Sequence, residues 1–204
     1  MPAARLRQAR RDDAPDIARL FNIAGHGLPA WYWKAAAAEG VDPFDLGTAR
    51  AARDDTDFGW RNTTIAEVDG VVAGGLIAYQ IASAPIDLYE LPPVFRPLQD
   101  LENQVDGATY VLALAVYPAF RCQGVGSLML AETEAAARAR AAAPGRPPAQ
   151  GAPVLALICA DGNREALALY RARGFDIAAR APVIPAEGWD CDSEFWLLLV
   201  KPLG

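Results

Sequence analysis

The fold of this chain is decided by the segment Val116-Tyr-Pro-Ala-Phe-Arg121-Cys-Gln-Gly124-Val-Gly126-Ser127. It runs from an apolar stretch, through an arginine and two spaced glycines, into a sequence with helical periodicity. Because glycine has no Cβ, successive backbone N–H groups can converge there on an anion at the positive end of the following helix. The segment therefore predicts an anion-binding cradle between a strand and a helix. The alternative is a loop in which the glycines only permit a tight turn.

Two other phosphate-binding patterns are missing from the sequence. The dinucleotide pattern G-x-G-x-x-G would need glycine where Met129 stands. The pattern G-x-x-x-x-G-K-[ST] occurs nowhere in the 204 residues. Neither motif therefore explains the cradle.

A second motif follows about forty residues later, in Asn163-Arg-Glu-Ala-Leu-Ala-Leu-Tyr170-Arg-Ala-Arg-Gly174-Phe175. On an α-helix, Asn163 and Tyr170 differ by about 20° and lie two turns apart on one face, so both can reach one ligand. Gly174 is expected to be the left-handed residue that ends this helix. Taken singly, Tyr170 fits a core tyrosine and Asn163 fits a helix N-cap.

The two motifs together resemble the coenzyme A site of the GNAT N-acetyltransferase superfamily. Arg121, Gly124 and Gly126 fill the three fixed positions of its Q/R-x-x-G-x-G/A pattern, whereas Cys122 stands where many members carry glycine. The resemblance covers most of the chain, from Arg5 to about Lys201. It implies acetyl-CoA as the cosubstrate and no metal.

The resemblance also implies a role for the residues of both motifs. Backbone N–H groups from Gln123 to Ser127 would hold the pyrophosphate, and the end of the preceding strand would splay open and pair with the pantetheine arm. Asn163 would contact the pantetheine, the N–H of Val116 or a neighbour would stabilise the developing oxyanion, and Tyr170 would protonate the leaving thiolate. Tyr170 is the expected catalytic residue. The expected coenzyme-binding residues are Leu114, Ala115, Val116, Arg121, Cys122, Gln123, Gly124, Val125, Gly126, Ser127, Asn163 and Tyr170.

The general base is the part of the site that the sequence leaves open. Many relatives carry a glutamate on the strand before the cradle, but Ala108–Val116 contains no carboxylate. Ordered water is one alternative. The candidates outside the strand are Glu102, Asp106, Glu187, Asp190, Asp192 and Glu194.

Two further features are candidates for lining an acceptor pocket. His26, the only histidine, is expected to be a solvated loop residue rather than a ligand-binding one. Trp31, Tyr32 and Trp33 are consecutive, so they cannot all face one way and some of them must be packing.

Composition and charge limit the class of protein. With 204 residues, 52% hydrophobic and 22% charged, the chain is expected to form one domain over residues 1–204. No run of about 18 apolar residues predicts a membrane span, and the N-terminal residues lack the apolar region of a secretory signal. Three cysteines without C-x-x-C spacing argue against a disulfide framework or a zinc site and favour the cytoplasm. The net charge of −6 argues against nucleic acid and suits cationic partners, although it also fits a plain need for solubility.

The expected fold class is α/β (α+β), with a mixed, largely antiparallel sheet of about six or seven strands and helices on both faces. Asp69-Gly70 predicts a type I′ hairpin. Residues 82–96 and 144–153 are expected to be loops. The expected strands are 6–9, 63–68, 71–80, 108–116, 154–160, 175–184 and 195–201. The expected helices run from a cap at Asp12 or Asp13 to about Gly25, from Pro29 to about Ala38, and over 45–53, 97–105, 125–143 and 163–173.

The sequence thus predicts an N-acetyltransferase that moves acetyl from acetyl-CoA to a primary amine of a small molecule, by direct attack in a ternary complex. A homodimer is one assembly that this prediction allows; nucleic-acid and membrane partners are not expected. A catalytically idle acyl-CoA-binding module is the alternative, favoured by the missing strand carboxylate and disfavoured by Tyr170. An ordinary α/β domain with coincidental motifs is the third possibility.

Overall fold

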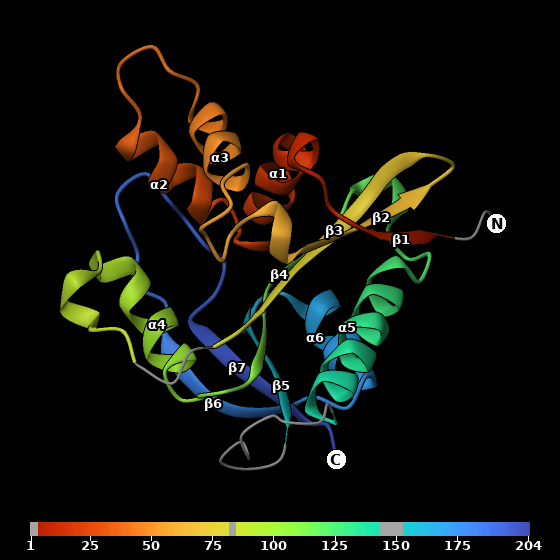
Figure 1. The fold of residues 1–204 in the computed structure, drawn as a ribbon. Coiled ribbons are helices and arrows are strands. Elements are labelled where there is room, and N and C mark those ends of the chain that lie inside the picture. Colours follow the sequence, from red (N-terminus) through yellow and green to blue (C-terminus); the bar gives the residue numbers. More distant parts are fainter. Residues whose placement is uncertain (1–3, 82–84, 143–152) are drawn as a thin grey trace. The chain divides into compact units, whose positions relative to one another are not determined.

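The protein is seen in a computed structural model that describes residues 4–81, 85–142 and 153–204. Its strands form one seven-stranded sheet in the order β1-β2-β3-β4-β5-β7-β6 (Figure 1). The pairs β1–β2, β2–β3, β5–β7 and β6–β7 are antiparallel, and β4–β5 is parallel. The strands are β1 (Arg5–Gln8), β2 (Thr63–Val68), β3 (Val71–Gln80), β4 (Thr109–Val116), β5 (Val154–Ala160), β6 (Asp176–Pro182) and β7 (Phe195–Pro202). The α-helices are α1 (Ala14–Ala24), α2 (Leu28–Ala36), α3 (Pro43–Ala51), α4 (Arg96–Glu102), α5 (Val125–Ala141) and α6 (Arg164–Ala172).

The mixed, largely antiparallel sheet confirms the expected fold class, and the expected elements recur with ends shifted by a few residues. Asp69 and Gly70 both have positive φ, 51° and 77°, as a type I′ turn requires. Two short 3₁₀ turns, Leu88–Glu90 and Pro93–Phe95, lie in the segment expected to be loop. The loop expected at 144–153 lies, apart from Pro153, outside the described residues.

The chain packs as two compact units. The first contains Met1–Tyr79 and Leu112–Glu132, and the second contains Gln80–Val111 and Thr133–Gly204. Strand β4 contributes Thr109–Val111 to the second unit and Leu112–Val116 to the first. The single domain expected over residues 1–204 stays a prediction.

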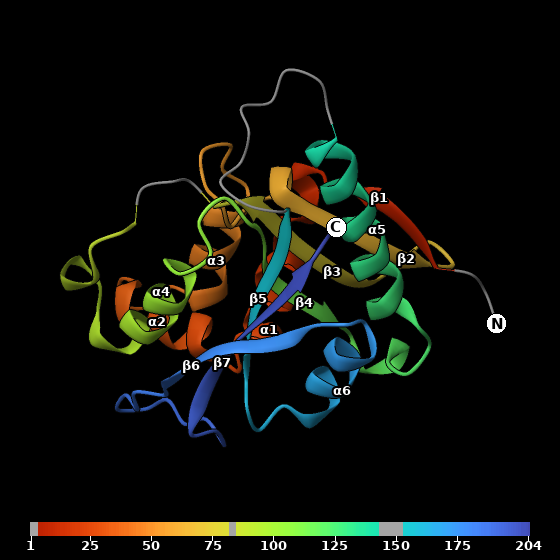
Figure 2. The same ribbon diagram turned by 90° about the horizontal axis from the view of Figure 1, so that it is seen from below.

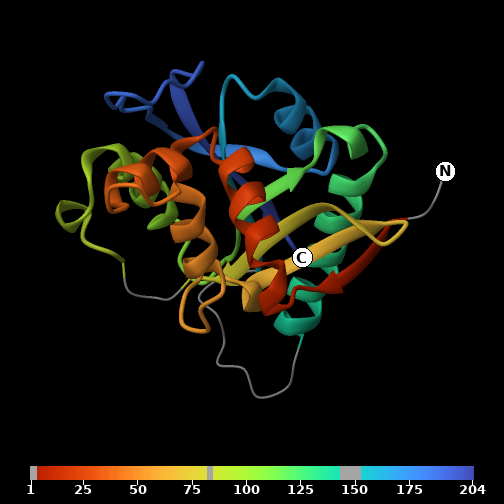
Figure 3. The same cartoon turned by 90° about the horizontal axis from the view of Figure 1, so that it is seen from above.

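In the first unit, helices cover both faces of the sheet (Figure 3). Gly74 and Gly75 are neighbours on β3, and successive side-chain positions in a strand point to opposite faces. A Cβ on Gly75 would lie 3.0 Å from Leu20 of α1, whereas a Cβ on Gly74 would lie 3.3 Å from Met129 of α5. Helices α1 and α5 therefore pack on opposite faces of β3.

An aromatic cluster forms much of the core on the α1 face. Trp33 is 1% exposed, and its ring lies 6.4 Å from that of Phe21, 5.7 Å from that of Phe44 and 6.1 Å from that of Phe58, measured between centroids. Trp31 and Tyr32 are only partly buried. Of the three consecutive aromatic residues, Trp33 is thus a packing residue, as expected for at least one of them.

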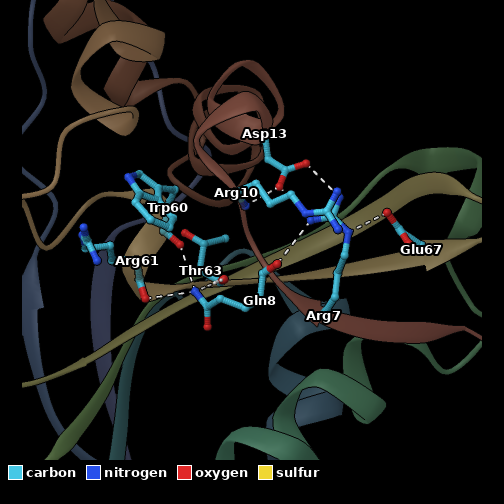
Figure 4. A network of polar contacts seen from close by, with 8 residues as sticks. All are labelled: Arg7, Gln8, Arg10, Asp13, Trp60, Arg61, Thr63 and Glu67. Atoms are coloured by element: carbon cyan, nitrogen blue, oxygen red, sulfur yellow. Dashed lines mark hydrogen bonds and ion pairs between the residues drawn. The ribbon is translucent and has the colours of Figure 1, made fainter.

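A polar network joins β1, β2 and the start of α1 (Figure 4). The Arg7 guanidinium donates to both oxygens of Asp13, at 2.7 and 2.8 Å, and to Glu67 at 2.6 Å. These hydrogen bonds from Arg7 lower the pKa of Asp13. Asp13 stands at the N-cap position of α1 but makes no capping hydrogen bond to it. The expectation that an Asp12 or Asp13 side chain caps this helix is therefore wrong for Asp13, because its oxygens are occupied by Arg7 and by the N–H of Arg10.

In the second unit, α4 packs against β5, β6 and β7 (Figure 2). Glu134 of α5 is buried, and three cations surround its carboxylate. Lys201 lies at 2.6 Å, Arg138 at 2.7 Å and Arg173 at 3.3 Å. These contacts join the end of α6 to β7 and α5, because Arg173 caps α6 and Lys201 belongs to β7.

Within the described ranges, no helix combines the length and apolar character that crossing a membrane requires.

Candidate active site

The end of β4 presents one backbone edge that β3 does not use. The N–H of Tyr117, the residue after β4, donates to the Ala73 carbonyl of β3 at 2.8 Å. Backbone groups alternate between the two edges of a strand, so those of Val116 and Leu114 face the edge away from β3. The Val116 carbonyl on that edge accepts a hydrogen bond from Arg121 Nε at 3.1 Å. The pairing of β4 with β5 is recorded from Thr109 to Val111, so the N–H groups of Leu114 and Val116 lie beyond the paired part of this edge.

Glycine at position 74 allows the end of β4 to lie this close to β3. A Cβ on Gly74 would come within 2.6 Å of the Ala115 carbonyl oxygen, which is closer than real Cβ contacts occur. Any larger residue at this position would displace the backbone of β4. Gly74 was not among the residues selected from the sequence, since no pattern around it predicts which strand approaches it.

The turn from Tyr117 to Gly124 leaves a row of free backbone donors. Gly124 accepts from the Leu128 N–H at 2.9 Å and is the N-cap of α5. In the described parts of the chain, no group accepts a hydrogen bond from the backbone N–H of residues 122–127. Unpaired donors at the N-terminus of a 17-residue helix are the geometry that the predicted anion site requires, and anion binding there stays a prediction.

The residues of the cradle have defined side-chain contacts and backbone torsions. Gln123 Nε2 donates to the Ala119 carbonyl at 3.0 Å, so it binds the turn itself. Gly124 has φ of 81°, and a Cβ there would meet nothing within 4 Å. Cys122 has φ of 57°. Its left-handed conformation costs a non-glycine residue about 1–2 kcal/mol, which gives a physical reason why glycine suits this position.

Helix α6 begins at Asn163 and carries the second motif. The Asn163 Oδ1 accepts from the Ala166 N–H at 3.2 Å, so this side chain is the N-cap of the helix. This geometry is that of a helix N-cap, one of the two alternatives for Asn163, and it does not test the other. Its contact with pantetheine stays a prediction.

The end of α6 explains the spacing of Tyr170, Gly174 and Phe175. Gly174 has φ of 81°, its N–H donates to the Arg171 carbonyl and the Phe175 N–H donates to the Tyr170 carbonyl, both at 3.0 Å. These two bonds form a Schellman motif, which is usually completed by an apolar contact between the residues that Tyr170 and Phe175 occupy. The two rings meet edge to face with 5.8 Å between centroids.

The Tyr170 side chain is buried, and its hydroxyl keeps its proton. It is 7% exposed, and burial, followed by the nearby Cys159, raises the pKa of its hydroxyl well above the ordinary value. The hydroxyl therefore keeps its proton at neutral pH, as a proton donor must. No residue in the described part of the chain forms a hydrogen bond with it.

The candidate bases are scattered over the second unit and none stands out. Glu102 ends α4 and Asp106 lies in the turn before β4. The other four, Glu187, Asp190, Asp192 and Glu194, lie between β6 and β7. Among the described residues, no group of three or more His, Cys, Asp or Glu side chains could hold a metal ion.

His26 differs from the solvated loop histidine that was expected. It lies in the turn between α1 and α2 with φ of 52° and is partly buried. Burial lowers the pKa of its imidazole, so the neutral form is favoured.

A polar pair beside the end of β4 was not predicted from the sequence. The Tyr117 hydroxyl donates to the Asp16 carboxylate of α1 at 2.6 Å. No sequence pattern could have indicated this contact, because the two residues are 101 positions apart.

Comparisons with known proteins bear on the family and the fold of the chain. The sequence model of the acetyltransferase (GNAT) family matches residues 27–175. An N-acetyltransferase from Staphylococcus aureus Mu50 has a similar structure, with a TM-score of 0.59 and 18% identity, over 97% of this chain and 100% of that one. The ribosomal-protein-S18-alanine N-acetyltransferase from Escherichia coli gives 0.57 and 15%, over 98% and 94%. The Salmonella typhimurium protein yncA, whose structure includes its cofactor acetyl-CoA, gives 0.57 and 16%, over 99% and 95%. No curated protein sequence matches the chain.

The chain belongs to the GNAT acetyltransferase family, since the family match covers well over half of it. It is therefore an acyltransferase of a family that uses acetyl-CoA. Of the predicted site residues, Leu114–Ser127 lie in the first compact unit, and Asn163 and Tyr170 lie in the second.

Proposed function

We propose that the chain transfers acetyl from acetyl-CoA to a primary amine of a small acceptor, by direct attack in a ternary complex. The observation that carries this proposal is the row of free N–H donors over residues 122–127 at the start of α5. Donors in this arrangement fit a pyrophosphate, which offers several anionic oxygens to one helix N-terminus.

The residues of β4 fit the remaining part of the cosubstrate. The N–H groups of Leu114 and Val116 face an edge that β3 leaves free, so they can pair with an extended chain of amides such as pantetheine. Acetyl-CoA, when bound, supplies an activated acetyl thioester.

The chain's own groups then have separate tasks. The N–H of Val116 or a neighbour donates to the carbonyl oxygen on which negative charge develops. Tyr170 supplies a proton to the departing sulfur, a task supported by the raised pKa of its hydroxyl and by the lack of a hydrogen-bond partner for that hydroxyl among the residues that the structure describes. The proton of the amine leaves through ordered water or to one of the carboxylates outside β4.

The acceptor is a cationic amine, because the net charge of −6 favours approach of cations. Activity is expected to rise with pH through the neutral range, as more of the amine loses its proton. Single alanine substitutions at Glu102, Asp106, Glu187, Asp190, Asp192 and Glu194 test the carboxylate route. If all six variants keep the wild-type pH–rate profile, the proton leaves through water.

Two measurements test the proposal as a whole. Calorimetry with coenzyme A measures binding at the cradle, and a thiol-release assay with acetyl-CoA screens small amines, polyamines, aminoglycosides, amino acids and peptides. Binding together with turnover of an amine is the expected result. Binding without turnover of any acceptor would favour the idle module, which the absence of a carboxylate on β4 keeps as the second candidate. Assembly as a homodimer stays a prediction, which size-exclusion chromatography with light scattering can check.

A further inference from the structure

The contact between Tyr117 and Asp16 has a defined direction. The phenol has one proton, and Tyr117 Oη donates it to Asp16 Oδ1 at 2.6 Å. Burial and this hydrogen bond raise the pKa of Tyr117 far above its ordinary value, although Arg19 acts in the opposite sense. The phenol therefore stays neutral, and its oxygen has only lone pairs left to offer.

The pair carries the negative charge of Asp16, and the positive charge of Arg19 lies near enough to act on Tyr117. Asp16 lies in the first turn of α1, where the helix dipole favours a carboxylate. Both residues are partly exposed. A group that binds at the Tyr117 oxygen must therefore donate a hydrogen bond, and a cation is favoured over a neutral donor.

The pair and the cradle lie on opposite sides of the sheet within the first unit. Tyr117 contacts α1, and the Gly75 position shows that α1 covers one face of β3. Helix α5, whose N-terminus forms the cradle, covers the opposite face at Gly74. The free edge of β4, at Val116, lies between them and immediately precedes Tyr117. A ligand at the pair would thus approach the end of β4 from the side that the pyrophosphate does not occupy.

We propose that Tyr117 and Asp16 bind the amino group of the acceptor, with the Tyr117 oxygen accepting an N–H hydrogen bond and Asp16 supplying the negative charge. This inference rests on the proposed function, since it needs the acetyl group at the free edge of β4. The acceptor is then a primary amine or its ammonium ion. One of its N–H groups donates to the Tyr117 oxygen. The pair also gives this chain an amine-binding group that does not belong to β4 itself.

The test compares two variants with two kinds of ligand. Tyr117→Phe removes the lone pairs and keeps the ring, whereas Asp16→Asn removes the charge and keeps an oxygen that accepts from the tyrosine. For the amines that are turned over in the screen, each variant should raise KM at least tenfold. Coenzyme A affinity, measured by calorimetry, should change less than twofold. Asp45→Asn, at the same first-turn position of α3, is the matched control and should leave KM unchanged.

A quaternary ammonium analogue of the same amine separates recognition from a structural effect. It carries the charge but no N–H, so Tyr117→Phe should leave its inhibition constant unchanged and Asp16→Asn should weaken it. Equal weakening of both ligands by Tyr117→Phe, together with a lower melting temperature, would show that the pair only supports the fold.

The remaining outcomes also decide the question. An unchanged KM in both variants contradicts the inference. If coenzyme A binds but none of n-butylamine, spermidine, kanamycin or glycinamide is acetylated or binds to the coenzyme-saturated protein, the inference is overturned while the cradle assignment stands. If coenzyme A itself does not bind, the proposed function fails first.

Discussion

Gly124 and Gly174 have the same positive φ of 81°, one at the start of a helix and the other at the end of a different helix. Gly124 begins α5, and the N–H groups around it find no acceptor in the described residues. Gly174 ends α6, where the carbonyls of Tyr170 and Arg171 accept from Phe175 and Gly174. The backbone N–H groups around Gly124 thus stay available for a ligand, whereas the last carbonyls of α6 near Gly174 are already hydrogen-bonded within the chain. The difference shows that a glycine motif indicates function only when the backbone groups around it remain unpaired.

Ion pairs within the second unit also stabilise the end of α6. Arg173, the C-cap of α6, contacts the buried Glu134, which also binds Lys201 and Arg138. This arrangement fixes the helix end that holds the Tyr170 ring against Phe175. Changes at the start of α5 should therefore affect ligand binding, whereas changes at the end of α6 should affect stability. The Tyr170 hydroxyl is the exception, because its loss should affect catalysis.

The largest effect is expected at the Tyr170 hydroxyl. Tyr170→Phe removes one hydroxyl and keeps the ring contact with Phe175, so kcat should fall by about 10 to 10⁴-fold, the range for a lost proton donor. Coenzyme affinity and melting temperature should change little. Tyr110→Phe, another buried tyrosine, is the control and should keep wild-type turnover. A Tyr170→Phe variant with the wild-type kcat would return Tyr170 to a packing role.

The next largest effect is expected at Glu134. Glu134→Gln leaves three cations without their carboxylate and should cost about 2 kcal/mol of unfolding free energy, less than a fully buried pair because Arg138 and Arg173 are partly exposed. Chemical denaturation measures the loss. Glu132→Gln, an exposed position on the same helix, should be neutral.

The pH dependence of that loss has a definite sign. Burial opposes ionisation of Glu134, but the hydrogen bonds from Lys201 and Arg138 outweigh it and lower the pKa below its ordinary value. The stabilisation is therefore complete above the unfolded pKa of about 4.3 and disappears as pH falls through the folded value. The wild type and Glu134→Gln should differ at pH 6 and converge in acid. A difference that stays constant down to acid unfolding would mean that the carboxylate charge contributes nothing.

A smaller effect is expected at the start of α5. Gly124→Asp places a side chain and a like charge among the donors, so coenzyme A affinity should fall at least tenfold, or about 1.4 kcal/mol. Gly70→Asp, at the hairpin turn with φ of 77°, controls for strain in the left-handed region. It should reduce stability without affecting coenzyme binding in calorimetry. Unchanged affinity in a folded Gly124→Asp protein would remove the main support for the cradle.

The smallest effect is expected at the end of α6. Gly174→Ala forces a Cβ into a left-handed conformation and should cost about 1 kcal/mol of stability. Gly174→Asn should cost less, because asparagine tolerates this conformation better. Thermal unfolding measures both. Equal stability of all three proteins would show that the glycine is not needed to end α6.

The sequence predicted those features whose physical cause is local. The Asp69-Gly70 turn, the αL glycine after α6 and the cradle before α5 each depend on a few adjacent residues. Their torsions follow from the absence or tolerance of a Cβ, so no distant contact is needed to predict them. The periodicity of apolar residues predicted strands and helices for the same reason.

The N-cap of α1 shows how local prediction fails. Asp13 has the residue type and position of a capping residue, yet the Arg7 guanidinium and the Arg10 N–H occupy its oxygens (Figure 4). A charged partner from β1 offers a stronger, bidentate hydrogen bond than a helix N–H does. His26 is a second case, because its partial burial depends on how α1 and α2 pack around the turn.

The sequence by itself determined the family motifs, the order of the elements and the glycines that shape the cradle and the end of α6. Only the tertiary structure decided which backbone donors stay free, which carboxylate the Tyr117 hydroxyl binds and how Glu134 gathers three cations. The reason is physical: torsional preferences act between neighbouring atoms of the chain, whereas hydrogen bonds and ion pairs join whichever groups folding brings together. Tyr117 and Asp16 are separated by 101 residues, and their contact exists only because α1 packs against the face of the sheet on which Tyr117 lies.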